Sequence, residues 1–422
     1  MLHKGRSIVI LGLCVSVLLL EGGATATSVN ARRRIVLFQH LDLTTTLGDL
    51  AARSIVTVSG STVVPTHTLP FINALVIELP LVNTAGALQL LQSSLDVAEI
   101  SEDPVAWVGQ ITPTLTLLVE DADWGVKRIE VPPVWQHTMG QGVQVAILDT
   151  GIDSSHPDLQ HIGGGYSALP GSGSYRDDHG HGTHMAGIIG AKLLNGPGII
   201  GVAPQASLWA VKVFDQTGSG YLSDFLKGLQ WVYGTDIRLV NMSIQLRDNY
   251  PPLEKATQRL SEQGVIMVAA AGNRCASGPP DEGGGDSGGE CHPEATAVTY
   301  PAAYPWVIAV GATDFYNEVT AYSRSGSALD VVAPGGSQAT KIRILSTTRG
   351  GGYGYGSGTS QATAHVTGLC ALALGLRPQL PFADLLELLQ TTARDLKYPA
   401  TAQGAGLSDA NALVQALLAL QK

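Results

Sequence analysis

From about Trp124 onward, short apolar runs alternate with longer segments that have helical spacing. Each run is almost continuously apolar, which is expected of a strand buried on both faces of a sheet. Strands that alternate with helices form parallel sheets covered by helices, because a parallel pair needs a long crossover connection. We therefore predict an α/β fold with a mostly parallel central sheet. The predicted strands are 143–148, 208–214, 238–244, 265–271, 307–310 and 329–332.

The part of the chain before this pattern is organised differently. Its apolar or helically spaced segments are 35–38, 74–79, 84–94 and 97–100. This mixture predicts a small α+β domain over residues 34–103. Residues 104–122 show no clear period, so we interpret them as a linker.

The first 26 residues have the pattern of a secretory signal peptide. Lys4 and Arg6 give a positively charged start, residues 8–20 are apolar, and residues 24–26 offer a cleavage site with small side chains. Such an apolar helix is about 20 Å long, too short for the roughly 30 Å core of a bilayer. We therefore predict a secreted protein with no stable membrane span after cleavage. An uncleaved anchor is the alternative.

Charge and composition argue against several classes of protein. The chain has 25 Lys and Arg against 35 Asp and Glu, a formal net charge of −10, which disfavours a protein that binds nucleic-acid phosphates. Hydrophobic residues make up 45% and charged residues only 14%, so the chain can fold around a core. Its 50 glycines in 422 residues are too few for the glycine at every third position that collagen needs. We therefore expect a globular protein without a nucleic-acid partner.

Four segments place polar residues at the ends of predicted strands or at the starts of predicted helices. Asp149 ends an apolar run, and open α/β sheets bind ligands beyond the carboxyl ends of their strands. His181 lies in a segment rich in Gly and His that opens a helix. Asn273 follows another apolar run and can donate a hydrogen bond to an oxyanion. Ser360 follows a Gly-rich turn at a helix start, where unpaired N–H groups favour a developing negative charge.

These segments, in this order, resemble the subtilisin family of serine endopeptidases. Further matching motifs are found at 201–204, 211–214, 300–301, 311–313, 332–335 and 404–407. The resemblance implies a three-layer fold with a mostly parallel central sheet. It also implies that Asp149 orients His181, which is the general base, and that Ser360 is the nucleophile. Asn273 is implied to stabilise the oxyanion together with the backbone N–H of Ser360.

By the same resemblance the chain is a secreted zymogen. It then divides into a signal peptide at 1–26, a propeptide at 27–112 and a subtilisin-like peptidase domain at 113–422. The propeptide is implied to assist folding, which is slow for parallel sheets, and to block the cleft until self-cleavage within 104–122. We expect a monomer that acts on proteins or peptides, is inhibited by its own propeptide and needs no cofactor for catalysis.

The resemblance also indicates which residues contact the substrate. They are Gly218, Ser219, Gly220, Ser243, Ile244, Gln245, Ala271 and Gly272. Gln245 departs from the family pattern, because many relatives have Gly at this position. It puts a side chain where Gly leaves room, so the family's preference for large apolar residues is not carried over to this chain.

Ions and disulfides give two further expectations. Asp158 and Asn195 occupy positions that share a calcium ion in many relatives, so a structural Ca²⁺ is implied. A surface Asp and a helix-ending Asn without metal are the alternative. Cys275 and Cys291 flank a polar segment, and secretion favours a disulfide between them, with free thiols as the alternative. Cys370 lies in an apolar run and is predicted to be buried.

Three other interpretations are open from the sequence. Residues 285–289 match the serine motif of trypsin-like proteases, which would make Ser287 the nucleophile, although those proteases are all-β. His179, His181 and His184 could hold a metal ion, but the metal would then occupy the base that the serine needs. A relative with the same cleft could bind peptides without cleaving them. Labelling by a serine-reactive reagent distinguishes these cases.

Overall fold

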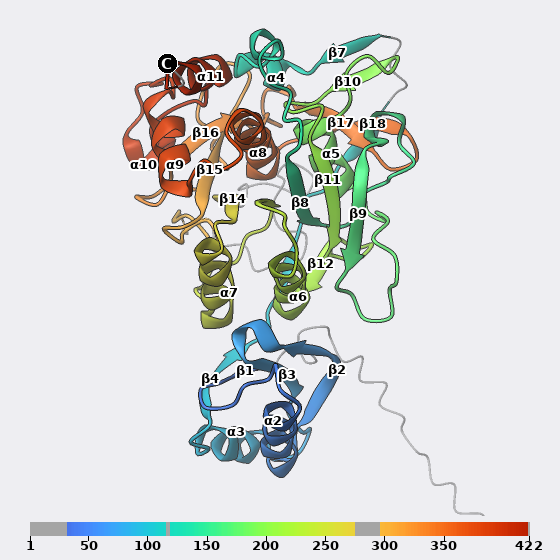
Figure 1. Cartoon of the computed structure of the whole chain (residues 1–422), viewed down its shortest axis with the longest axis vertical. Coiled ribbons are helices and arrows are strands. Elements are labelled where there is room, and N and C mark those ends of the chain that lie inside the picture. The colour runs from blue at the N-terminus through green and yellow to red at the C-terminus, as the bar shows by residue number, and fades with distance from the viewer. Residues whose placement is uncertain (1–31, 115–118, 275–295, 421–422) are drawn as a thin grey trace, which may run out of the picture.

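The computed structural model describes residues 32–114, 119–274 and 296–420. Figure 1 shows a small N-terminal unit below a larger one, with two helices of the larger unit facing the boundary between them. The central sheet of the larger unit has the strand order β16-β15-β14-β13-β8-β11-β9. These strands are β8 (Gln144–Asp149), β9 (Ile162–Ser167), β11 (Ser207–Lys212), β13 (Leu239–Met242), β14 (Ile266–Ala270), β15 (Ile308–Thr313) and β16 (Val331–Pro334).

Every neighbouring pair in this seven-stranded sheet is parallel, which confirms the predicted fold class. Six of the strands coincide with the predicted ones within a few residues. β9 is absent from the prediction because its residues Ile162–Ser167 include three consecutive glycines and lack an apolar run. It is one of the two edge strands of the sheet, where less apolar surface needs to be buried.

Two pairs of helices sandwich the sheet. In one pair, α5 (His181–Gly190) packs against α8 (Thr359–Leu376), and α8 lies along β13 to β16. In the other, α6 (Leu222–Tyr233) packs against α7 (Pro251–Glu262), and the two contact β8, β9 and β14. The remaining helices of this unit are α4 (Trp124–Arg128), α9 (Phe382–Thr391), α10 (Ala400–Gln403) and α11 (Ala410–Ala419), with 3₁₀ turns η2 (Pro132–Val134) and η3 (Pro157–Leu159). Within the described ranges, no helix combines the length and the hydropathy needed to cross a membrane.

The small unit is a four-stranded antiparallel sheet covered by two helices. Its elements are β1 (Arg33–Phe38), α2 (Thr46–Val58), β2 (Thr62–Leu69), η1 (Pro70–Ile72), β3 (Ala74–Glu78), α3 (Thr84–Gln92) and β4 (Val97–Glu102). Side chains alternate along β1: Val36 and Phe38 pack in the core of the small unit, whereas Ile35 and Leu37 join the core of the larger one. The face that lacks helices of its own is thus closed by α6 and α7 (Figure 1).

The linker predicted at 104–122 is wrong, because this segment contains three short strands. They are β5 (Val105–Trp107), β6 (Thr112–Thr114) and β7 (Glu120–Ala122). Each pairs with a strand of the larger unit: β5 with β12 (Ser219–Tyr221), β6 with β18 (Gly352–Gly356) and β7 with β10 (Gly198–Ile200). β18 also pairs with β17 (Ile344–Thr348). Strands of three residues are too short to produce a period, so their partners alone define them.

Candidate active site

Asp149 and His181 are in direct contact. Asp149 is the last residue of β8 and His181 the first of α5, and both side chains are buried. The imidazole Nδ1 donates to the carboxylate and lies 2.9 Å from each of its oxygens. The backbone N–H of Thr150 donates to the same carboxylate at 2.8 Å. A carboxylate at Nδ1 fixes the orientation and tautomer of the ring, which leaves Nε2 as the atom that can accept a proton.

The other ring nitrogen of His181 has no partner among the described residues. Nε2 is buried and makes no hydrogen bond within the part of the chain that the structure describes. Buried polar atoms are normally satisfied, so an unpartnered one needs an explanation. In this structure the nitrogen therefore makes no hydrogen bond to the hydroxyl of Ser360 either.

The loops that carry Asp149 and His181 are tied together by Asp177, which sequence reasoning missed as a site residue. Its carboxylate accepts from the backbone N–H of Thr183 at 2.9 Å, in the first turn of α5, and from the hydroxyl of Thr150 at 2.9 Å. The Thr150 hydroxyl in turn accepts from the N–H of Gly182. A Cβ at Gly182 would lie 2.1 Å from the carbonyl oxygen of Gly151, so only glycine allows this approach.

Lys212 is a second positioning residue that sequence reasoning missed. Its side chain is 2% exposed, and its ammonium donates to the carbonyl oxygens of Thr150 (2.6 Å) and Phe214 (2.9 Å). It also pairs with Asp178 at 2.6 Å. A buried ammonium is tolerated only with such partners, and here they connect β11 to the loop after Asp149. The signal in the sequence is a lysine inside an apolar run.

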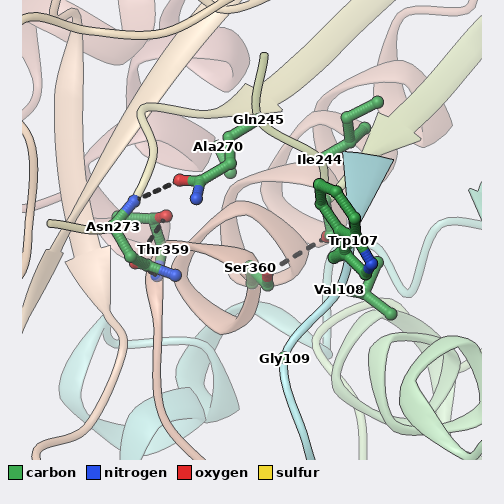
Figure 2. A pocket seen from close by; sticks show the side chains of 10 residues that line it. Trp107, Val108, Gly109, Ile244, Gln245, Ala270, Asn273, Thr359 and Ser360 are labelled. Carbon is green, nitrogen blue, oxygen red and sulfur yellow. Dashed lines mark hydrogen bonds between the residues drawn. The ribbon is translucent and has the colours of Figure 1, made fainter. Parts of the chain in front are cut away.

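Ser360 and Asn273 meet at the start of α8. Ser360 is the second residue of α8 and is 8% exposed, and Asn273 follows β14. The Oδ1 atom of Asn273 accepts from the backbone N–H (2.9 Å) and the hydroxyl (3.0 Å) of Thr359. These two hydrogen bonds hold the amide oxygen at the first residue of α8. The Nδ2 atom is therefore the end of the amide that can donate to a ligand. All three residues line one pocket (Figure 2).

The N-terminal unit sends an extended segment into this cleft. β5 pairs in antiparallel fashion with β12, which contains the predicted substrate-binding residues Ser219 and Gly220. The backbone N–H of Val108 extends the ladder by donating to the carbonyl oxygen of Gly218 at 2.8 Å. Three residues of this segment line the pocket that contains Ser360. They are Trp107, Val108 and Gly109 (Figure 2).

The same segment continues on the other side of the pocket. β6 pairs in antiparallel fashion with β18, with Thr112 opposite Tyr355. The side chain of Ile111 covers two glycines of β18, because a Cβ added at Gly354 or Gly356 would lie 3.0 or 2.9 Å from it. Residues 105–114 therefore cross the cleft as an extended chain that is paired on both sides of the pocket with Ser360.

The other predicted substrate-binding residues follow β13 and β14. Ser243, Ile244 and Gln245 line the pocket with Ser360. Ala271 is fully buried and is not among the residues that line this pocket, whereas its neighbour Ala270 is. The N–H of Ala271 donates to the carbonyl oxygen of Val310, and its carbonyl oxygen accepts from Thr299.

Gly272 lies between these segments and is crowded by side chains. A Cβ added there would lie 2.6 Å from Oγ1 of Thr299, 2.9 Å from Cδ of Arg324 and 2.9 Å from Oε1 of Gln245. Sequence reasoning found Gln245 but missed Thr299 and Arg324, which come from distant segments.

Asp158 and Asn195, the predicted calcium ligands, lie side by side. The Nδ2 atom of Asn195 is 3.1 Å from Oδ1 of Asp158 and 3.1 Å from the carbonyl oxygen of Pro157. The second carboxylate oxygen of Asp158 accepts from the backbone N–H of Ile199 and from the hydroxyl of Tyr353, each at 3.0 Å. The two predicted residues thus share a cluster of oxygen atoms between η3 and β10.

The three histidines of the alternative metal site have separate roles. His181 pairs with Asp149, and Nε2 of His184 bonds the carbonyl oxygen of Gly354 at 3.1 Å. Burial lowers the pKa of His184 to about 3 and lowers the pKa of His179 as well, so both rings favour the neutral form. Among the described residues, no three His, Cys, Asp or Glu side chains gather as a metal site.

Several predictions concern residues outside the described ranges. They are the signal peptide at 1–26, the disulfide between Cys275 and Cys291, and the alternative nucleophile Ser287. Cys370 is described, and it is a free thiol that is fully buried in α8, as predicted.

The N-terminal unit is fastened to the larger one at the start of α6. The carboxylate of Asp103 accepts from the backbone N–H and the hydroxyl of Ser223, each at 2.8 Å, and pairs with the guanidinium of Arg33 at 2.9 Å. Burial raises the pKa of Asp103 to about 6, because desolvation outweighs the attraction of Arg33 and the hydrogen bonds from Ser223. Nearby, Nε2 of His67 lies 2.6 Å from a carboxylate oxygen of Asp224, and both side chains are buried.

Comparisons with known proteins agree with this geometry. The model of the subtilase family matches residues 140–407. The chain is 38% identical over 309 residues to subtilisin E of Bacillus subtilis (strain 168), which covers 73% of each chain. It is 36% identical over 340 residues to M-protease of Shouchella clausii (strain KSM-K16), covering 80% of this chain and 82% of that protein. Subtilisin of Bacillus pumilus is 39% identical over 276 residues, which are 65% of this chain and 92% of that protein.

Proposed function

Because the chain belongs to the subtilase family of serine peptidases, we propose that it is a secreted endopeptidase, made as an inactive precursor, that uses Ser360, His181 and Asp149. The Asp149–His181 pair carries this proposal. The imidazole is held at Nδ1 by a buried carboxylate, and its Nε2 is buried without a partner in the described ranges. The helices that begin at His181 and next to Ser360 pack against each other.

The proposed reaction has two halves. In the first, Oγ of Ser360 attacks the carbonyl carbon of the peptide while Nε2 of His181 takes the hydroxyl proton. The C–N bond then breaks as the imidazolium gives this proton to the departing amine, which leaves an acyl-enzyme. In the second half, water attacks the acyl carbon, His181 takes a proton from it, and the same proton returns to Ser360 as the acid is released.

Two groups orient and stabilise these steps. Asp149 remains ionised and stabilises the imidazolium that forms at His181. The oxyanion of each tetrahedral intermediate accepts hydrogen bonds from the backbone N–H of Ser360 and from Nδ2 of Asn273. The Asn273 amide is already held at its oxygen by Thr359, so it needs little reorientation during the reaction.

The N-terminal unit acts as the inhibitor of the precursor. Its segment 105–114 occupies the strands that would bind a substrate, so an external peptide has no edge with which to pair. The bond to be cut is the one after Gly109, because Gly109 is the last residue of the segment that lines the pocket with Ser360. Hydrolysis there yields a propeptide that ends at Gly109 and a catalytic chain that begins at Gln110.

The first cut leaves β6 on the catalytic chain. β7 follows β6 and pairs with β10, so it tethers β6 close to β18 after the cut. β6 therefore stays with the catalytic chain when the propeptide dissociates.

A structural Ca²⁺ held by Asp158 and Asn195 is part of this proposal. Two oxygens, Oδ1 of Asp158 and the carbonyl oxygen of Pro157, converge on the Asn195 amide. Rotation of that amide by half a turn brings a third oxygen to the same point, and oxygen ligands are those that Ca²⁺ prefers. The ion would stabilise the fold and would supply no chemistry to the reaction.

Replacement of the nucleophile tests this function. Ser360→Ala is expected to accumulate as an uncut precursor, whereas the parent chain separates into two chains, the second with Gln110 at its N-terminus. Ser261→Ala, in α7 and outside the cleft, is the matched control and should process normally. A Ser360→Ala precursor that is still cut at the normal rate would show that another protease matures the chain.

A further inference from the structure

We propose that Gln245, together with Thr299, restricts the residue on the acyl side of the cleaved bond to Gly or Ala. The inference rests on the function proposed above and concerns the part of the pocket next to Asn273. It identifies Gln245 and Thr299 as specificity-determining residues of the substrate cleft.

Two segments form the walls of this part of the pocket. β13 and β14 are parallel neighbours, with Met242 paired to Ala269. Beyond the paired residues, one segment contributes Gln245 and the other contributes Asn273 to the lining around Ser360. A side chain that extends from one segment to the other therefore limits the size of the substrate side chain that can enter between them.

The Gln245 side chain bridges the two walls. Its Oε1 atom accepts from the backbone N–H of Asn273 at 2.6 Å. Figure 2 shows the side chain reaching from its own segment to this N–H. Because the bond anchors the far end of the side chain, Gln245 cannot leave the pocket without breaking it.

Thr299 lies next to the end of the Gln245 side chain, at Gly272. Gly272, with φ +101°, has no side chain, yet the position of its missing Cβ is only 2.6 Å from Oγ1 of Thr299 and 2.9 Å from Oε1 of Gln245. The Thr299 hydroxyl is fixed by a 3.0 Å hydrogen bond to the carbonyl oxygen of Ala271. The volume that a glycine opens at this point is therefore taken by two tethered side chains.

The inhibitory segment of the chain fits this restriction. The residue that it places last in the pocket is Gly109, and a Cβ added there has no atom within 4 Å, so Ala is accommodated. A longer side chain that reached Gly272 would have to displace Gln245 and leave the N–H of Asn273 without its acceptor. That loss reduces the rate constant kcat/KM by about tenfold or more.

Matched peptide substrates test the inference. Two peptides that differ only by Ala or Phe before the cleaved bond are hydrolysed by the parent enzyme with an Ala-to-Phe ratio of kcat/KM of at least about ten. Gln245→Gly is expected to lower this ratio about tenfold, and Gln245→Gly with Thr299→Gly should lower it further. Equal ratios in the parent and in both variants would overturn the inference.

A volume-conserving variant distinguishes the effect of the volume of the Gln245 side chain from the effect of its hydrogen bond to Asn273. Gln245→Met keeps the length of the side chain but cannot accept from Asn273, so its ratio should stay close to that of the parent. A decrease in the Ala-to-Phe ratio as large as that in Gln245→Gly would contradict the inference that the volume of the side chain restricts the pocket. Active enzyme is counted by titration with a fluorophosphonate, so partial misfolding does not change the ratio. A parent chain that takes no label would refute the proposed function and not this inference.

Self-cleavage gives a second readout that needs no synthetic substrate. Gly109→Phe in the full precursor is expected to slow its own cleavage about tenfold, and Gln245→Gly in the same chain should restore most of the rate. Cleavage of Gly109→Phe at the parent rate would contradict the restriction.

Discussion

Replacing Asp103 with Ala is expected to loosen the propeptide without touching the reacting groups. Asp103 is buried between the two units, where it accepts two hydrogen bonds from Ser223 and pairs with Arg33. Alanine leaves the N–H of Ser223 without its acceptor in the first turn of α6 and leaves the Arg33 charge without its carboxylate.

The size of the effect follows from these contacts. Breaking a buried ion pair by removing one partner costs about 3–5 kcal/mol, much of it from the charge that remains. After release, water solvates Ser223 and Arg33, so this cost falls on the complex alone. At about 1.4 kcal/mol for each factor of ten, the cleaved propeptide of Asp103→Ala should dissociate at least about 100-fold faster than that of the parent.

The assay follows the appearance of activity. The purified complex of cleaved propeptide and catalytic chain is diluted into a peptide p-nitroanilide, and the lag before steady hydrolysis gives the rate of dissociation. Glu102→Gln is the matched control, because this neighbouring carboxylate is 71% exposed and lies 3.9 Å from Arg34. A lag in Asp103→Ala equal to those of the parent and of Glu102→Gln would refute the reasoning.

Three further predictions concern pH, packing and metal. The pKa of Asp103 is raised to about 6 in the complex and is about 3.9 after release, so binding takes up a proton between these two pH values. Propeptide affinity should therefore be highest below about pH 4, fall as the pH rises to about 6 and stay constant above it, and Asp103→Asn should flatten this dependence. Gly182→Ala should abolish activity, because its Cβ would lie 2.1 Å from a backbone oxygen, whereas Gly173→Ala, with nothing within 4 Å, should leave activity and Tm unchanged. EDTA should lower the Tm of the parent by roughly 5 °C and leave that of Asp158→Ala unaffected; an unchanged parent Tm would count against the ion.

The sequence predicts the central sheet well because its strands are buried on both faces. An almost continuous apolar run such as that of β8 or β14 is visible without any knowledge of its neighbours. The polar residues at the ends of these strands, Asp149 and Asn273, are then informative for the same reason, since parallel strands end at one edge of the sheet.

Elements that depend on contacts with residues distant in sequence could not be predicted from the sequence. β5, β6 and β7 have three residues each and are strands only because β12, β18 and β10 lie beside them. Asp177 and Thr299 were missed for a related reason: each acts through contacts with residues distant in sequence, namely Thr150 and Gly272. Gln245 was found because it departs from a family pattern, but its bond to Asn273 is visible only in three dimensions.

The central claim is that His181 activates Ser360 as the nucleophile. The most direct measurement is reaction of the mature enzyme with a fluorophosphonate, followed by peptide mapping of the adduct by mass spectrometry. A single adduct on Ser360, formed much more slowly in His181→Ala, is the predicted result. An adduct on Ser287, or a Ser360 that remains unlabelled in a folded and processed enzyme, would contradict the claim.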